Sequence, residues 1–220
     1  MTKFLHKNVQ FYTYSKRGGI IMKLKSSKTY TNLARAWASE CQARTRYEFV
    51  EYGLRYNGFE ALAQIVDTIA YQEFNHARML YTHIQDADPK EIANIDIDAG
   101  FPFKEKWDME ENLRLLAEDE KLEAEAYEEF AQVADKEGFT DIAKLFRMIG
   151  EVEVRHKKLF INLYEQFKNK ELYKKDVEKM WICPNCGYIS IDEEAWETCP
   201  LCQAEQGVCQ VVIPEELRCW

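Results

Sequence analysis

The sequence lacks several features that define common classes of protein. It has no apolar run approaching the roughly 18–20 residues that a membrane helix requires. Its 38 acidic residues outnumber its 29 basic ones, and the net charge of −9 argues against a nucleic-acid-binding surface. It also contains no G-x-G-x-x-G segment that would bind a dinucleotide. We therefore expect a globular protein with no membrane partner, no nucleic-acid partner and no nucleotide site of its own.

Cysteine is present in an odd number, seven, which argues against a framework of disulfides. Four cysteines form two C-x-x-C pairs that are separated by twelve residues: Cys183, Cys186, Cys199 and Cys202. This spacing is typical of a tetrahedral site for zinc or iron. The other three, interpreted as ordinary residues, are Cys41, Cys209 and Cys219. Free thiols beside a metal site suit a reducing compartment, so we expect a cytoplasmic location.

The chain divides into three parts by composition. Residues 1–21 are basic and free of acids, lack the apolar core of a secretory signal, and are expected to form a disordered extension. Residues 22–175 have the length of one ordinary domain. Residues 176–220 contain the four spaced cysteines. A segment of about 40 residues cannot bury enough apolar surface to fold stably without a cross-link such as a bound metal.

The central domain contains an internal repeat with an offset of 80 residues and no gap. GFEALAQIVDTIAYQEFNHARMLY at 58–81 aligns with GFTDIAKLFRMIGEVEVRHKKLFI at 138–161, and Tyr47 aligns with Tyr127. Each copy is interpreted as two amphipathic helices joined at a glycine. Two such hairpins predict a four-helix bundle, and residues 86–108 are long enough to cross over along it.

Acidic and imidazole side chains occupy core positions of these amphipathic helices. They are Glu40 on the first helix, Glu73 and His76 on the second, Glu120 and Glu123 on the third, and Glu153 and His156 on the fourth. Such groups are costly to bury unless something compensates their charge, and two dications would do so. One Glu from each of two helices plus Glu-x-x-His from each of the other two is the arrangement of di-iron or di-manganese bundles. Oxygen-rich ligands with one nitrogen per metal favour iron or manganese over a closed zinc site.

Glu123 breaks the repeat, because its counterpart is Ala43. The simpler interpretation is a surface glutamate in an acidic stretch, but Glu123 shares a helix face with Glu120. We place the neighbouring charged residues on the polar side of the helix: Glu118, Asp119, Lys121 and Glu125. A seventh ligand near one metal would make the two metal positions unequal.

Five segments in order resemble the rubrerythrin family: SECQARTRY (39–47), QEFNH (72–76), EDEKLE (118–123), EVRH (153–156), and WICPNCGY with CPLC. The resemblance covers about residues 22–220 and implies a mainly α protein. It implies a ferritin-like four-helix bundle with a long crossover, followed by a small rubredoxin-like domain of short β-strands and knuckles. It also implies a di-iron centre with Glu40 and Glu120 as terminal, Glu73 and Glu153 as bridging, and His76 and His156 as nitrogen ligands. One mononuclear iron would be bound by Cys183, Cys186, Cys199 and Cys202.

The activity that the resemblance implies is that of a non-haem di-iron peroxidase, which reduces hydrogen peroxide to water in oxidative-stress defence. Glu123 and His76 would be the catalytic pair, exchanging on one iron. Electrons would come from a separate NAD(P)H-dependent reductase or a rubredoxin through the rubredoxin-like iron, in a head-to-tail homodimer.

Two rival functions are weaker. Ferroxidase or iron-handling activity does not require an attached electron carrier. A scaffold that carries a zinc ribbon does not require seven inward-facing ligands.

Overall fold

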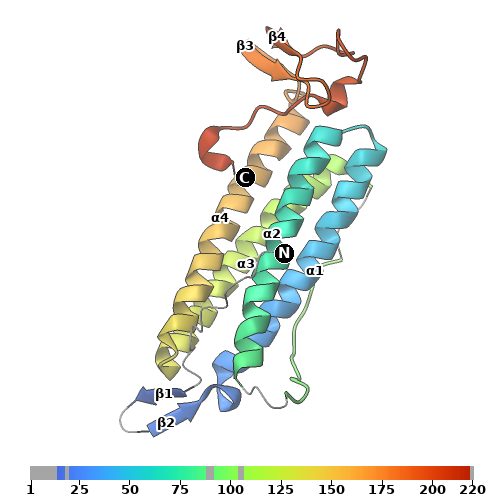
Figure 1. The fold of residues 1–220 in the computed structure, drawn as a ribbon. Helices are drawn as coiled ribbons and strands as arrows, with labels where there is room; N and C mark the ends of the chain where they lie inside the picture. The colour runs from blue at the N-terminus through green and yellow to red at the C-terminus, as the bar shows by residue number, and fades with distance from the viewer. Residues whose placement is uncertain (1–13, 18–19, 88–91, 104–106, 219–220) are drawn as a thin grey trace, which may run out of the picture.

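Four long helices run side by side in the computed structural model, which describes residues 14–17, 20–87, 92–103 and 107–218 (Figure 1). They are α1 (Lys28–Tyr56), α2 (Glu60–Asp86), α3 (Met109–Glu137) and α4 (Thr140–Lys168). Helix α1 packs along α2, α3 packs along α4, and α1 also contacts α3. The predicted bundle of two hairpins is therefore confirmed. Among the described helices, none has an apolar stretch of the length needed to cross a membrane.

Local signals in the sequence set the ends of these helices. At the start of α1 the Ser27 side chain accepts a hydrogen bond from the backbone N–H of Tyr30 at 3.1 Å, which satisfies a donor of the first turn. Both hairpins turn at a glycine with positive φ, 83° at Gly58 and 85° at Gly138. Because side chains disfavour this conformation, glycine at both positions lets the two repeats turn in the same way.

The connection between α2 and α3 crosses from one end of the bundle to the other (Figure 1). Its described part, residues 92–103, has no helix or strand. Ile92, Ile95 and Ile97 pack against the core near the start of α1. Because α3 begins near the end of α1, the crossover makes α1 and α3 antiparallel, as expected for two hairpins related by a pseudo-twofold axis.

The apolar core is split into two clusters with a polar layer between them. One cluster contains Val50, Leu54 and Leu113 and lies toward the α1–α2 turn. The other contains Leu33 and Phe146 and lies toward the opposite end. The polar layer contains the buried residues Glu40, Glu73, His76, Glu120, Glu153 and His156. The amphipathic pattern of the sequence therefore predicted correctly that these charged side chains face inward.

The C-terminal domain forms a cap on the α1–α2 end of the bundle (Figure 1). Strand β3 (Lys174–Ile182) pairs antiparallel with β4 (Ile189–Glu194), followed by short 3-10 helices η2 (Gln206–Val208) and η3 (Glu215–Leu217). The turn η2 contacts α2, η3 contacts α4, and Val211 and Ile213 complete a core cluster of the bundle. The predicted domain boundary between residues 175 and 176 falls inside β3.

The N-terminal extension has strand structure where it is described. Strand β1 (Tyr14–Arg17) pairs antiparallel with β2 (Ile20–Lys23), and the 3-10 helix η1 (Leu24–Ser26) leads into α1. The prediction of disorder over residues 1–21 is therefore wrong for these strands, whose pairing satisfies backbone donors and acceptors. The adjacent β-branched residues Ile20 and Ile21 favour this structure. The rest of the predicted extension, 1–13 and 18–19, lies outside the described residues.

Candidate metal centre

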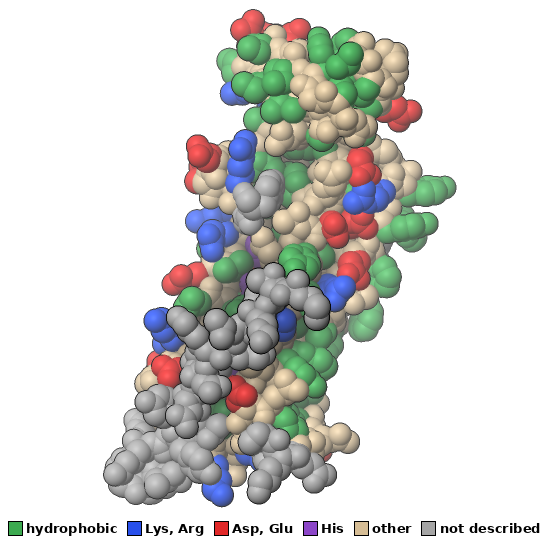
Figure 2. All heavy atoms as spheres, viewed as in Figure 1, with side chains coloured by type: hydrophobic (Ala, Val, Ile, Leu, Met, Phe, Trp, Pro, Cys, Tyr) green, Lys and Arg blue, Asp and Glu red, His purple; other side chains and the backbone are tan. Residues whose placement is uncertain are grey.

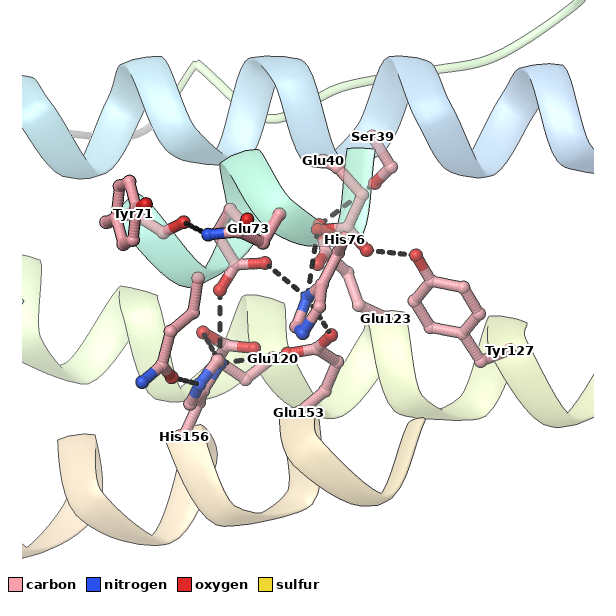
Figure 3. Close-up of polar contacts among 12 residues, drawn as sticks. Ser39, Glu40, Tyr71, Glu73, His76, Glu120, Glu123, Tyr127, Glu153 and His156 are labelled. Atoms are coloured by element: carbon pink, nitrogen blue, oxygen red, sulfur yellow. Dashed lines mark hydrogen bonds and ion pairs between the residues drawn. The ribbon is translucent and has the colours of Figure 1, made fainter. Parts of the chain in front are cut away.

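Four carboxylates and two imidazoles from four helices meet in the polar layer (Figure 3). Helix α1 contributes Glu40, α2 contributes Glu73 and His76, α3 contributes Glu120, and α4 contributes Glu153 and His156. The spacing of three residues places the acid and the imidazole of α2, and likewise of α4, on one helix face. All six side chains point toward one another rather than toward solvent.

The ligand atoms form two groups that share two carboxylates. The first group is Glu40, Glu73, His76 and Glu153, and the second is Glu73, Glu120, Glu153 and His156. Within each group these atoms lie within 4.8 Å of one another. The shared Glu73 and Glu153 therefore lie where bridging ligands of a two-metal centre would lie. Glu40 and Glu120 each belong to one group, as expected of terminal ligands.

The chemistry of these donors fits two cations. Several buried atoms make no hydrogen bond among the described residues and have at most an ion-pair contact between imidazole and carboxylate: Glu40 Oε2, Glu73 Oε1, Glu120 Oε2, both carboxylate oxygens of Glu153, and His156 Nδ1. The two imidazoles aim Nδ1 at the shared carboxylates, at 3.0 Å for His76 to Glu153 and 2.9 Å for His156 to Glu153. Unsatisfied buried acceptors are costly, and bound cations would satisfy them together. The site can therefore hold two metal ions.

Protons balance the charge of this cluster when metal is absent. Burial, together with the charge of Glu73, raises the pKa of Glu40 well above its usual range, and burial likewise raises the pKa of Glu120. Burial disfavours charged imidazoles, but the surrounding carboxylates outweigh it and raise the pKa of both His76 and His156. Metal binding must displace these protons, because metal ligands are deprotonated.

The second ring nitrogen of His156 is tied to α2. Nε2 of His156 lies 2.7 Å from Oε1 of Gln72 and donates to it, which leaves Nδ1 directed at the carboxylates. In the repeat, Gln72 aligns with Val152, whose side chain cannot make this bond to His76. Sequence reasoning missed Gln72 because it precedes Glu73 directly and lies off the core face, so no periodicity marks it.

Two buried tyrosines orient the terminal carboxylates. The Tyr47 hydroxyl donates to Oε1 of Glu120 at 2.8 Å, and the Tyr127 hydroxyl donates to Oε1 of Glu40. Each bond joins α1 to α3, and the two bonds are related by the repeat. The repeat already aligned Tyr47 with Tyr127. Because both lie on the core face of their helices, the sequence could also have assigned them to the site.

Glu123 lies beside the centre but belongs to neither group of ligand atoms. Its Oε1 accepts a hydrogen bond from the Ser39 hydroxyl at 2.9 Å, and its Oε2 is buried without a hydrogen-bond partner among the described residues. Burial and the charges of Glu73 and Glu153 raise the pKa of Glu123 to about 8. Its role as a seventh ligand therefore stays a prediction.

Asp119 differs from its predicted position on the polar side of α3. Its side chain is buried, at 3% exposure, and pairs with the Arg46 guanidinium at 2.6 Å. The helical period predicted which residues face the bundle axis, but Asp119 faces the neighbouring helix α1 instead. The other residues that were placed on the polar side, Glu118, Lys121 and Glu125, are exposed.

The four spaced cysteines converge in the C-terminal domain. All four Sγ atoms lie within 4.8 Å of one another, with 3.7 Å between Cys183 and Cys202 and between Cys186 and Cys199. The cysteines are free, so the site offers four sulfur ligands in the arrangement of a tetrahedral metal site.

Each cysteine pair lies on a tight loop whose turn needs a positive φ. Gly187 adopts 75° after the first pair, and Gln203 adopts 63° at the matching place after the second. Burial opposes ionisation of Cys199, but the backbone N–H groups of Cys202 and Leu201 lower the pKa of its thiol to about 7. The second loop therefore favours the thiolate form of Cys199, the form that binds a metal.

Comparison with known proteins agrees with both sites. A family model described as rubrerythrin matches residues 31–178, and a model of the rubrerythrin rubredoxin-like domain matches residues 181–207. The chain belongs to the rubrerythrin family. A rubrerythrin of Clostridium perfringens is 36% identical over 189 residues, covering 86% of this chain and 96% of its own length. One from Porphyromonas gingivalis is 34% identical and covers 84% and 90%.

Solved structures agree on the fold. A nigerythrin in a partially reduced state aligns with a TM-score of 0.55 at 24% identity, covering 85% of this chain and 90% of that one. A Desulfovibrio desulfuricans bacterioferritin with a diiron site aligns with a TM-score of 0.54 at 25% identity, covering 66% and 82%. This rubrerythrin-family chain thus has the predicted ferritin-like bundle, with the residues of a di-iron site and of a rubredoxin-like four-cysteine site.

Proposed function

We propose that this chain is a peroxidase that reduces hydrogen peroxide to water, in cytoplasmic defence against oxidative stress. The observation that carries the proposal is the pair of ligand groups sharing Glu73 and Glu153, with a four-cysteine site in the same chain. Two irons at the shared site would supply both electrons of the reduction together, and an iron bound by four thiolates would pass single electrons to recharge them.

The two groups of ligand atoms support the following ligand roles. We assign Glu40 and Glu120 as terminal, Glu73 and Glu153 as bridging, and His76 and His156 as nitrogen ligands. Glu123 and His76 would be the catalytic pair, as the two residues able to exchange as ligands of one metal. The tether from Gln72 to His156 supports the choice of His76 as the imidazole that moves, because Val152 provides no such tether for His76.

Reduction of one hydrogen peroxide to two waters consumes two electrons and two protons, so the site must hold protons as well as electrons. In the metal-free site the Glu123 carboxyl, whose pKa is raised to about 8 by burial and by the charges of Glu73 and Glu153, can hold one proton at neutral pH. Tyr47 and Tyr127 keep Glu120 and Glu40 in fixed orientations through their hydroxyl groups. Apolar clusters on both sides limit water in the polar layer.

The route of the electrons favours a head-to-tail homodimer. The C-terminal domain contacts the start of α2, and Glu73 lies thirteen residues after Glu60, where α2 begins. That is roughly 20 Å along the helix. Pro184 of the first cysteine loop lines a pocket with α2 residues as far as Thr68, so the four-cysteine site lies beside the first turns of α2 rather than at the metal centre of its own bundle. A neighbouring subunit that runs in the opposite direction would bring the two sites closer.

The outer face of the first hairpin supports such a dimer. Large apolar side chains are exposed along this face, with Phe49 at 63%, Tyr52 at 59% and Tyr71 at 65%, and Figure 2 shows hydrophobic side chains along the edge formed by α1. Their repeat counterparts on the second hairpin are polar: Glu129, Gln132 and Glu151. Exposed apolar patches of this kind mark interaction surfaces.

Ferroxidase activity is the second candidate, favoured by the likeness of the bundle to that of a bacterioferritin. The attached four-cysteine domain argues against it, because oxidation of iron for storage needs no electron carrier.

The variant Cys186→Ser tests the proposed peroxidase. It should abolish turnover driven by a reductase, while a pre-reduced di-iron site should still be oxidised by peroxide in a single turnover under anaerobic conditions. Cys209→Ser is the matched control, because Cys209 is buried in the same domain outside the four-cysteine group. If wild-type protein loaded with iron does not reduce peroxide faster than it reacts with dioxygen, ferroxidase activity is the better assignment.

A further inference from the structure

The contact between α1 and α3 breaks the symmetry of the repeat. Repeat partners across this contact are Ser39 with Asp119, Ala43 with Glu123, and Arg46 with Ala126. Two polar interactions join the helices here, Ser39 to Glu123 and Arg46 to Asp119. Neither has a counterpart in the repeat, because Ala43 replaces Glu123 and Ala126 replaces Arg46. The difference between the two halves is therefore concentrated around Glu123.

The hydrogen bond from Ser39 determines where the Glu123 carboxylate lies. The Ser39 hydroxyl donates to Oε1 at 2.9 Å and keeps the carboxylate directed toward α1, outside both groups of ligand atoms (Figure 3). The other oxygen, Oε2, is buried and has no hydrogen-bond partner among the described residues. Glu123 is thus bound through one oxygen only, and a cation in the centre would compete with Ser39 for it.

A cavity of about 200 Å³ gives the Glu123 side chain room to move. It lies between α1, α3 and the crossover, and its lining includes Ser39, Glu123, Leu122 and Phe101. The buried pair of Arg46 and Asp119, 2.6 Å apart, lines the same cavity and fixes α1 against α3. Glu123 can therefore change rotamer without repacking the core, while Ser39 keeps its position.

We propose that Ser39 is a positioning residue that holds Glu123 away from the metals and so keeps one ligand position open. This role rests on the proposed function in one respect, the assignment of Glu123 as an exchangeable ligand. A hydrogen bond to a charged group shifts an equilibrium by roughly 10- to 100-fold. Loss of the Ser39 hydroxyl should therefore shift Glu123 toward the metals by about that factor.

Cobalt(II) in place of iron tests the proposal without any turnover. Its visible absorption per ion weakens as the coordination number rises, so it reports whether Glu123 has joined the ligands. Ser39→Ala should lose absorption relative to wild type, and Ser39→Thr, which keeps the hydroxyl, should match wild type. Alanine has a higher helix propensity than serine, so α1 is retained in Ser39→Ala. Cobalt in the four-cysteine site contributes equally to every variant and cancels in difference spectra.

Glu123→Ala supplies the background that separates the proposed role from a general structural effect. In that background Ser39→Ala should leave the cobalt spectrum unchanged, because the side chain that moves is gone. An unchanged spectrum for Ser39→Ala alone, or a change that persists in the Glu123→Ala background, overturns the proposal. Peroxidase assays are separate: absence of peroxidase activity together with the expected cobalt spectra contradicts the proposed function and leaves the role of Ser39 intact.

Discussion

In the first hairpin Glu40 accepts a hydrogen bond from Tyr127 of the second, and in the second hairpin Glu120 accepts one from Tyr47 of the first. Glu73 and Glu153 are shared by both groups of ligand atoms. The two halves of the metal centre are therefore built alike and depend on each other, because each hairpin completes the site of the other.

The same two halves differ in what surrounds the ligands. His156 is tethered by Gln72, whereas the related position beside His76 is Val152. Glu123 has Ala43 as its counterpart and is bound by Ser39. The repeat thus accounts for the set of metal-binding side chains, and a few differences outside that set tether His156 in one half and add Glu123, which has no counterpart, beside the centre.

The largest expected effect comes from removing a shared carboxylate. Glu73→Ala should lose both metals, because Glu73 belongs to both groups, whereas Glu40→Ala should lose one. Metal analysis of protein purified with iron measures the difference, and Glu118→Ala, at an exposed position of α3, is the control. Retention of one metal by Glu73→Ala would show that the two positions do not share this ligand.

Acidification should weaken metal binding at both halves. The metal-free site holds protons, since the pKa values of His76, His156, Glu40 and Glu120 are all raised, and a bound metal must displace them. Metal affinity is therefore highest above these pKa values. It decreases as the pH is lowered, by about tenfold per pH unit for each proton displaced. Competition with a chelator between pH 8 and pH 6 measures the slope, and a flat profile would contradict this proton balance.

Loss of the Gln72 tether should weaken one half selectively. Gln72→Leu removes the partner of His156 Nε2, and loss of such an outer partner lowers metal affinity by about 10- to 100-fold. The matched control is Val152→Leu at the related position, which should have little effect. Stepwise metal titration measures the two positions separately, and equal weakening of both would mean that the tether does not distinguish them.

The smallest effects are expected at the paired tyrosines. Tyr47→Phe and Tyr127→Phe each remove one hydrogen bond to a carboxylate while keeping the ring, so each should lower the free energy of unfolding by about 1 kcal/mol. Denaturant unfolding of the metal-loaded protein measures both values. Similar losses of unfolding free energy would support the equivalence of the two halves. A large difference would mean that the tyrosines that orient the carboxylates also differ between the halves.

Periodicity and the repeat predicted the fold because both describe how each helix faces the bundle axis. They located the hairpin turns at Gly58 and Gly138, and they identified the six carboxylate and imidazole side chains that the structure brings together. Asp119 was misplaced because it faces a neighbouring helix rather than the axis. The strand pair at Tyr14–Arg17 and Ile20–Lys23 was missed because a basic, acid-free segment resembles a disordered tail in composition.

The sequence by itself determined the bundle, the identity of the inward-facing carboxylates and imidazoles, and the four sulfur ligands. These follow from spacing along one chain, which sets helix faces and knuckle loops directly. The resemblance had already implied that Glu73 and Glu153 are shared, as the structure shows. Only the tertiary structure decided that Gln72 reaches His156 and that Ser39 binds Glu123. The physical reason is that such contacts depend on the rotation and separation of packed helices, which the order of residues within each helix does not specify.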